Sequence, residues 1–232
     1  MYSIKQKGMT LIELTVVLLI LVALAGLTIP YVSGTSRKAL CDATDVSMMN
    51  IKQVIMQRYY LDTLGKFPQD LSSLSENTGS EKYQLHFLFS NTSLGGRVHK
   101  DFDLDSQVGW NGPYLQESQI LDAALTAGNY NSSTYTEPFL VGHHVVMDGW
   151  GRPFVLQVPT VAECKALLSL STDPEKDYCA RLVSAGSGSG LGSGNGTIDT
   201  AISAHKDNDG DDRMLYLSAP TPAQDINAAC GE

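Results

Sequence analysis

The sequence predicts an α+β fold in which one long N-terminal α-helix, first transmembrane and then amphipathic, packs on a small antiparallel β-sheet. Three observations predict it: an apolar run at residues 9–29, a helical spacing of apolar side chains at residues 44–59, and short β-rich segments from residue 143 onward. The 232 residues suffice for one modest globular domain and an appendage.

The first element is a basic leader followed by the apolar run. Residues 1–8 contain Lys5 and Lys7 and no acidic residue, and no charge occurs from Leu14 to Ile29. As a helix, residues 9–30 would extend roughly 30 Å, which matches the hydrocarbon core of a bilayer. Because the lysines precede the run, we expect a single-pass membrane protein with a cytoplasmic N-terminus.

Glu13 interrupts this apolar run. A carboxylate at membrane depth costs on the order of 3 kcal/mol, so it needs a partner. Cleavage after Gly8 would create an α-amine at Met9, which is cationic at neutral pH. We expect Glu13 to neutralise such an amine, either its own or that of a neighbouring subunit.

The segment Gly8–Glu13 (GMTLIE) resembles the prepilin-peptidase site of type IV pilins and type II secretion pseudopilins. That family has a short basic leader that ends in Gly, followed by a hydrophobic helix with Glu at its fifth position. Pro30 falls where many members have a helix-bending proline. The resemblance implies a pilin-like fold, cleavage after Gly8, N-methylation of Met9 and a role for Glu13 in assembly.

The resemblance also implies partners and a location. The partners are other copies of the chain, joined through their N-terminal helices, together with a prepilin peptidase, an inner-membrane assembly platform and minor pseudopilins or pilins. The expected location is the inner membrane before assembly and a periplasmic or cell-surface filament afterwards. The expected function is structural rather than enzymatic: the major pseudopilin of a type II secretion system, or alternatively a type IV pilus subunit for adhesion, motility or DNA uptake.

Other readings of the N-terminus explain less. An ordinary secretory signal cleaved after Ala25 leaves Glu13 unexplained, and a plain membrane anchor without polymerisation is a further alternative. A secreted hydrolase would need a catalytic motif, yet neither G-x-S-x-G nor HExxH occurs. The net charge of −9 disfavours binding of nucleic acid by the head and suits cation binding.

Residues 31–64 are predicted as the amphipathic half of the same helix. Its apolar face carries Thr44, Met48, Ile51, Ile55 and Tyr59. We expect the helix to end near Leu64, since Gly65 and Pro68 follow. Residues 65–232 then form the globular head.

Two motifs in the head resemble segments of major pseudopilins. Residues 110–115 (WNGPYL) resemble the W-x-G-P-Y-L segment, and residues 148–154 (DGWGRPF) resemble the D-x-W-G-x-P-Y segment. Gly151 and Pro153 predict a turn, and Trp150 is expected to cap the core. We assign both motifs a structural role.

The predicted strands are residues 143–147, 154–158, 181–184 and 214–218, and residues 83–89 are predicted as a strand or a short helix. Residues 184–196 form a Gly/Ser loop. This loop lacks both G-x-G-x-x-G and Gly-Lys-Ser/Thr, so we exclude nucleotide binding.

The acidic cluster of the head is the candidate metal site, formed by Asp207, Asp209, Asp211 and Asp212. Densely packed carboxylates favour a cation, and Ca²⁺ takes six to eight oxygen ligands. The cluster is not an EF-hand, but together with Ser184–Gly186 it resembles the calcium loop of major pseudopilins. A solvated acidic turn is the alternative.

The four cysteines lack zinc-ligand spacing, and an even count in an exported chain favours disulfides. Cys164 and Cys179 are predicted to close a short loop, which leaves Cys41 with Cys230; free buried thiols are the alternative. His143 and His144 point to opposite faces of a strand, which argues against a transition-metal site.

Overall fold

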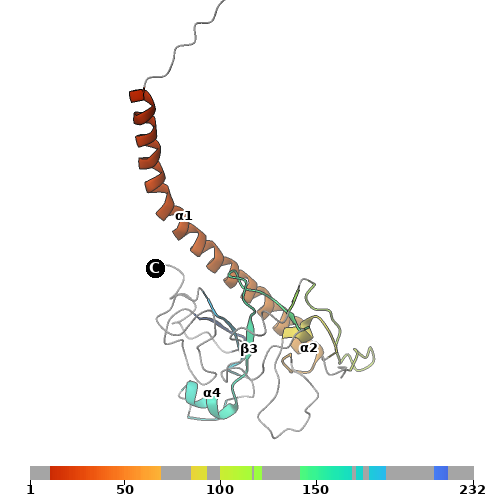
Figure 1. Cartoon of the computed structure of the whole chain (residues 1–232). Helices are drawn as coiled ribbons and strands as arrows, with labels where there is room; N and C mark the ends of the chain where they lie inside the picture. Colours follow the sequence, from red (N-terminus) through yellow and green to blue (C-terminus); the bar gives the residue numbers. More distant parts are fainter. Residues whose placement is uncertain are drawn as a thin grey trace, which may run out of the picture.

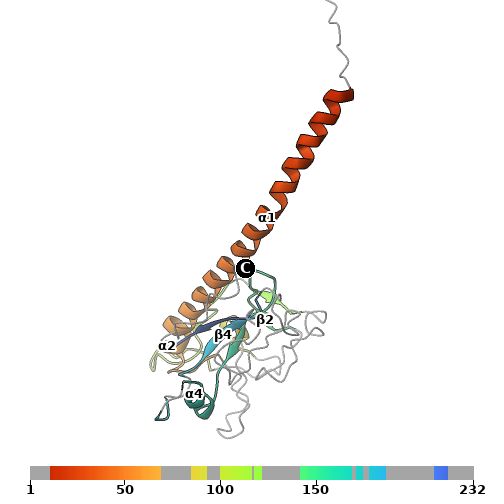
Figure 2. The same cartoon turned by 90° about the vertical axis from the view of Figure 1, so that its left-hand side faces the viewer.

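The computed structural model describes residues 11–68, 85–92, 100–116, 118–121, 142–168, 171–174, 178–186 and 212–218. Helix α1 (Leu11–Val54) is followed without a break by a π-helical turn, η1 (Ile55–Tyr59), and by α2 (Tyr60–Asp62). The N-terminal end of α1 projects away from the head, whereas its C-terminal half lies along it (Figures 1 and 2). The head here means the described residues from 85 onward.

The helical residues end close to the predicted position. Asp62 is the last of them, and the chain then turns through Leu64 (φ 56°) and Gly65 (φ 81°). The Gly65 amide donates to the Tyr60 carbonyl and so closes the final turn. A glycine fits here because positive φ costs it little.

The head contains a three-stranded antiparallel sheet with the order β3-β4-β5. Its strands are β3 (Val155–Gln157), β4 (Arg181–Ser184) and β5 (Arg213–Tyr216). Val155 pairs with Val183, and Val183 pairs with Met214. A second pair joins β1 (Gln119–Ile120) to β2 (His144–Val145), and β2 contacts η2 (Leu85–Leu88), a short 3₁₀-helix.

One face of the sheet packs on α1, as the alternation of side chains along each strand allows. The buried side chains at this contact are Met48, Ile51, Ile55 and Tyr59 from the helix and Phe154, Leu156, Leu182, Leu215 and Leu217 from the sheet side. Leu85, Phe87, Leu88 and Tyr114 extend the same core. The apolar stripe of the helix predicted from sequence therefore forms one side of the core.

The opposite face carries Val155, Val183 and Met214 and, near Tyr216, helix α4 (Val161–Leu167). Thr160 begins α4 with a capping box, since its hydroxyl accepts from the Glu163 amide while the Glu163 carboxylate accepts from the Thr160 amide. The sheet is thus covered on both faces.

The predicted transmembrane half of the fold is wrong. Within the described residues, no helix is both long enough and apolar enough to cross a membrane. The expected location, a single-pass inner-membrane protein that later enters a periplasmic or surface filament, is wrong on the same finding.

Candidate functional site

The N-terminal part of α1 exposes apolar side chains on every side. Seven consecutive residues, 16–22, are each between 48% and 70% exposed, and they complete nearly two helical turns. The exposed large apolar side chains of this segment are Leu11, Ile12, Leu14, Val16, Val17, Leu18, Leu19, Ile20, Leu21, Val22 and Leu24. We call residues 11–24 the apolar segment.

Glu13 lies in the first turn of α1, within the apolar segment, and is exposed. The Thr15 hydroxyl donates to the Ile12 carbonyl one turn earlier, so the Thr15 hydroxyl is hydrogen-bonded within the helix itself. The processing residues Gly8 and Met9 lie outside the described residues. Pro30 lies within α1, whose backbone is helical through that position.

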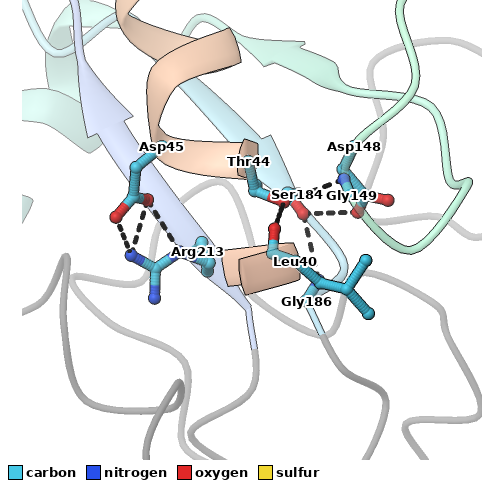
Figure 3. Close-up of polar contacts among 8 residues, drawn as sticks. All are labelled: Leu40, Thr44, Asp45, Asp148, Gly149, Ser184, Gly186 and Arg213. Carbon is cyan, nitrogen blue, oxygen red and sulfur yellow. Dashed lines mark hydrogen bonds and ion pairs between the residues drawn. The ribbon is translucent and has the colours of Figure 1, made fainter. Parts of the chain in front are cut away.

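An ion pair joins α1 to the sheet at the base of the head. The Arg213 guanidinium of β5 donates to both carboxylate oxygens of Asp45 on α1 (Figure 3). Two turns further along, the Lys52 ammonium donates to the Tyr216 carbonyl over 2.7 Å. Burial lowers the pKa of Lys52. Both ends of β5 are therefore attached to the helix through polar side chains.

The D-x-W-G-x-P motif forms a second attachment to α1. The Gly149 amide donates to the Thr44 hydroxyl over 2.9 Å, and that hydroxyl donates to the Leu40 carbonyl (Figure 3). A Cβ at Gly149 would lie 2.2 Å from the Leu40 oxygen. Only glycine permits this approach of the loop to the helix.

Asp148 holds the turn that places Gly149. One carboxylate oxygen accepts from the Trp150 and Arg152 amides, and the other accepts from the Ser184 hydroxyl over 2.6 Å. Gly151 completes the turn with φ 77°. Burial is the largest influence on Asp148 and raises its pKa, although these donors oppose it. The predicted turn is confirmed, and its acid is structural.

The W-x-G-P-Y-L segment is also structural. The Trp110 indole donates to the Phe87 carbonyl over 2.8 Å, and the Tyr114 ring lies edge-on to Tyr59 with centroids 5.2 Å apart. The Tyr114 hydroxyl accepts from the Asn111 amide. Burial raises the pKa of Tyr114 to about 12. The segment ties η2 to the helix core.

The acidic cluster is described in one position. Asp207, Asp209 and Asp211 lie outside the described residues, whereas Asp212 is buried at the start of β5. Desolvation lowers the pKa of the buried Arg181 guanidinium most strongly, whereas Tyr216 and, to a smaller extent, the charge of Asp212 raise it. In the part of the chain that the structure describes, no group of three or more His, Cys, Asp or Glu side chains is placed to hold a metal. The calcium site therefore stays a prediction.

The disulfide between Cys164 and Cys179 is confirmed. It joins α4 to the residues that precede β4, and both cysteines pack against Tyr216. Cys41, on the buried face of α1, is also disulfide-bonded. Cys230 lies outside the described residues, so the pairing of Cys41 with Cys230 stays a prediction.

Sequence reasoning missed one cluster. It considered His143 and His144 only as neighbours on a strand, whereas the ring of His86 lies against both, with centroids 5.1 Å and 5.3 Å away. Because 58 positions separate His86 from His144, no local spacing in the sequence points to this contact.

Comparison with known proteins adds no relative: no protein-family model, curated protein or solved structure matches the chain.

Proposed function

We propose that the chain is a structural subunit of a type IV pilin-like filament, with the role of a type II secretion major pseudopilin that drives protein export. One observation supports this most directly. The apolar segment is exposed on all sides of a helix that projects from a folded head.

The exposure around the whole helix argues for a filament rather than a dimer. A two-stranded coiled coil covers one stripe of each helix and would leave the remaining apolar surface in water. A helix that is apolar all round needs neighbours on every side. Copies of this chain, bundled through residues 11–24, would supply them and would place the acidic heads outside.

Glu13 gives this bundle a register. A carboxylate enclosed among apolar helices requires a compensating cation. In the proposed assembly, cleavage after Gly8 frees the Met9 amine, and Glu13 of one subunit binds the amine of a neighbour. Prepilin peptidase, an assembly platform and minor subunits remain the proposed partners.

The test is assembly of the processed full-length chain, measured by sedimentation and electron microscopy. Glu13→Gln is expected to abolish filaments, and Leu18→Asp is expected to do the same by placing a charge in the bundle. Asp42→Asn, which changes an exposed residue of α1 near the head, is the matched control and should assemble normally. Filaments formed by Glu13→Gln at wild-type yield would contradict the proposal.

N-terminal sequencing tests the processing step separately. Mature protein that begins at Met9 supports the proposal. Mature protein that begins at Gly26 would lack the apolar segment and would contradict the proposal.

A bacterial strain that lacks this protein distinguishes the secretion role from the alternative role as a type IV pilus subunit. Loss of exported proteins from the medium supports the pseudopilin. Normal export with loss of adhesion, motility or DNA uptake supports a type IV pilus subunit, which the N-terminal resemblance favours equally.

A further inference from the structure

The His86 side chain has both ring nitrogens engaged and is buried. Its Nδ1 lies 3.0 Å from the backbone nitrogen of His144, and its Nε2 lies 2.9 Å from the carbonyl oxygen of Thr92. A backbone N–H only donates and a carbonyl only accepts. The ring is therefore neutral, with its proton on Nε2.

A second proton on His86 would meet another donor. It would sit on Nδ1 and face the N–H of His144, so a hydrogen bond would become a contact between two donors. The ring could accommodate the proton only if η2 and β2 moved apart.

The surroundings of the ring disfavour a positive charge. His144 of β2 and His143, which precedes that strand, face the ring. The 3₁₀-helix η2 carries no other titratable residue, and the segment after η2 contributes the Thr92 carbonyl. The Ser118 hydroxyl, next to β1, is hydrogen-bonded to the His144 ring and not to the His86 ring. Burial lowers the pKa of His86 most strongly, Thr92 raises it, and His144 lowers it further.

The rest of η2 is attached elsewhere. The Phe87 carbonyl accepts from the Trp110 indole, and the Leu88 carbonyl accepts from the Tyr114 amide over 2.8 Å. The β1–β2 pair keeps its own hydrogen bond from the Leu121 amide to the His143 carbonyl. If the β1–β2 pair separated from η2 at His86, each of the two parts would therefore keep its other hydrogen bonds.

We propose that His86 is an acid-sensitive latch that holds the β1–β2 pair against η2 and releases it when the imidazole is protonated. The latch is independent of filament assembly, because it uses no residue of α1.

The direction of the pH effect on the latch follows from proton linkage. Since folding lowers the pKa of His86, the unfolded or opened state binds the proton more tightly, and the latch is weakened as pH falls below the ordinary value of about 6.5. Between pH 7 and pH 5, this linkage raises the opening constant by up to roughly 25-fold.

Amide hydrogen exchange of the full-length chain tests the latch. The protection factor of the His144 amide should fall by up to roughly 25-fold from pH 7 to pH 5, while that of the Tyr114 amide stays constant. His86→Gln, which offers an acceptor and a donor but does not titrate, should remove this pH response. His144→Gln, which keeps the backbone donor and His86, should retain it.

Three outcomes would overturn the latch: a parallel loss of protection at Tyr114, a His86→Gln variant with the wild-type pH response, or a pH response lost in His144→Gln. Nitrogen NMR of the unmodified chain provides a check that needs no variant. It should find the His86 proton on Nε2 at pH 7, and a proton on Nδ1 would contradict the proposal.

Discussion

Arg213 on β5 binds both carboxylate oxygens of Asp45 on α1, with Nε 2.9 Å from Oδ1 and Nη2 2.6 Å from Oδ2. The arginine side chain is 2% exposed, whereas the aspartate side chain is 23% exposed. The guanidinium has thus lost most of its hydration, and Asp45 supplies the compensating charge.

Removing that charge should destabilise the head strongly. We expect Asp45→Ala to lower the free energy of unfolding by about 3 kcal/mol, because a buried guanidinium is left without its carboxylate. Replacing both partners, as in Asp45→Ala with Arg213→Met, should recover much of the loss. Urea unfolding of the wild type, Asp45→Ala, Arg213→Met and the double variant measures the coupling energy, and additive losses would contradict the pairing.

The contact at Gly149 predicts a steric effect that differs from ordinary glycine strain. Gly149→Ala places a methyl group against the Leu40 carbonyl and breaks the bond to Thr44, so we expect a loss of about 2 kcal/mol or more. Gly151→Ala is the matched control, since no atom lies within 4 Å and only its φ of 77° is unfavourable. It should cost about 1 kcal/mol. Equal losses in thermal melts would show that contact with α1 is unimportant.

Asp148 should tolerate loss of its charge but not of its oxygen acceptors. Asp148→Asn keeps a carbonyl oxygen for the Trp150 and Arg152 amides, so we expect a change within about 1 kcal/mol, whereas Asp148→Ala should cost about 2–3 kcal/mol.

The same variants carry a pH test of Asp148. Because folding raises the pKa of this carboxyl, the folded state binds the proton more tightly, and the wild type should gain stability relative to Asp148→Asn as pH falls from 7 toward the ordinary carboxyl value. His86 titrates in both proteins, so its contribution cancels. A difference in unfolding free energy that stays constant with pH would contradict this sign.

Calcium, if bound, should raise the melting temperature relative to chelator. Calcium at a hundredfold excess over its Kd adds about 2.7 kcal/mol to the free energy of unfolding. Asp209→Ala should abolish this shift, whereas Asp212→Asn should destabilise the head with or without calcium, because it removes a charge near Arg181. An unchanged wild-type midpoint would leave the acidic cluster as a solvated turn.

Short-range patterns in the sequence predicted much of the head. Residues 181–184 form β4 with the predicted bounds, and the turn at Gly151 is where glycine and proline place it. Residues 83–89 were ambiguous because their apolar side chains lack a strict period, and residues 85–88 form a 3₁₀-helix. Local preference thus fixes these elements within a few residues.

Contacts between residues far apart in the chain could not be predicted from patterns in the sequence. Gly149 reads as a turn residue, and nothing near it indicates that the Leu40 carbonyl lies against it. The strand predicted at 143–147 shortens to β2 and pairs with β1 rather than with the main sheet, while Met147 forms a bridge to Pro153. The transmembrane prediction also failed, since within the described residues no helix is both long and apolar enough to cross a membrane.

The attachments between α1 and the head also matter for how the molecule bears tension. A pull along the helix enters the head through Asp45, Lys52 and Thr44, and these lead to both ends of β5 and to the turn at Gly149. Because the load divides between two separate parts of the chain, rupture of one link transfers force to the others. A molecule anchored in this way should yield in one cooperative event rather than link by link.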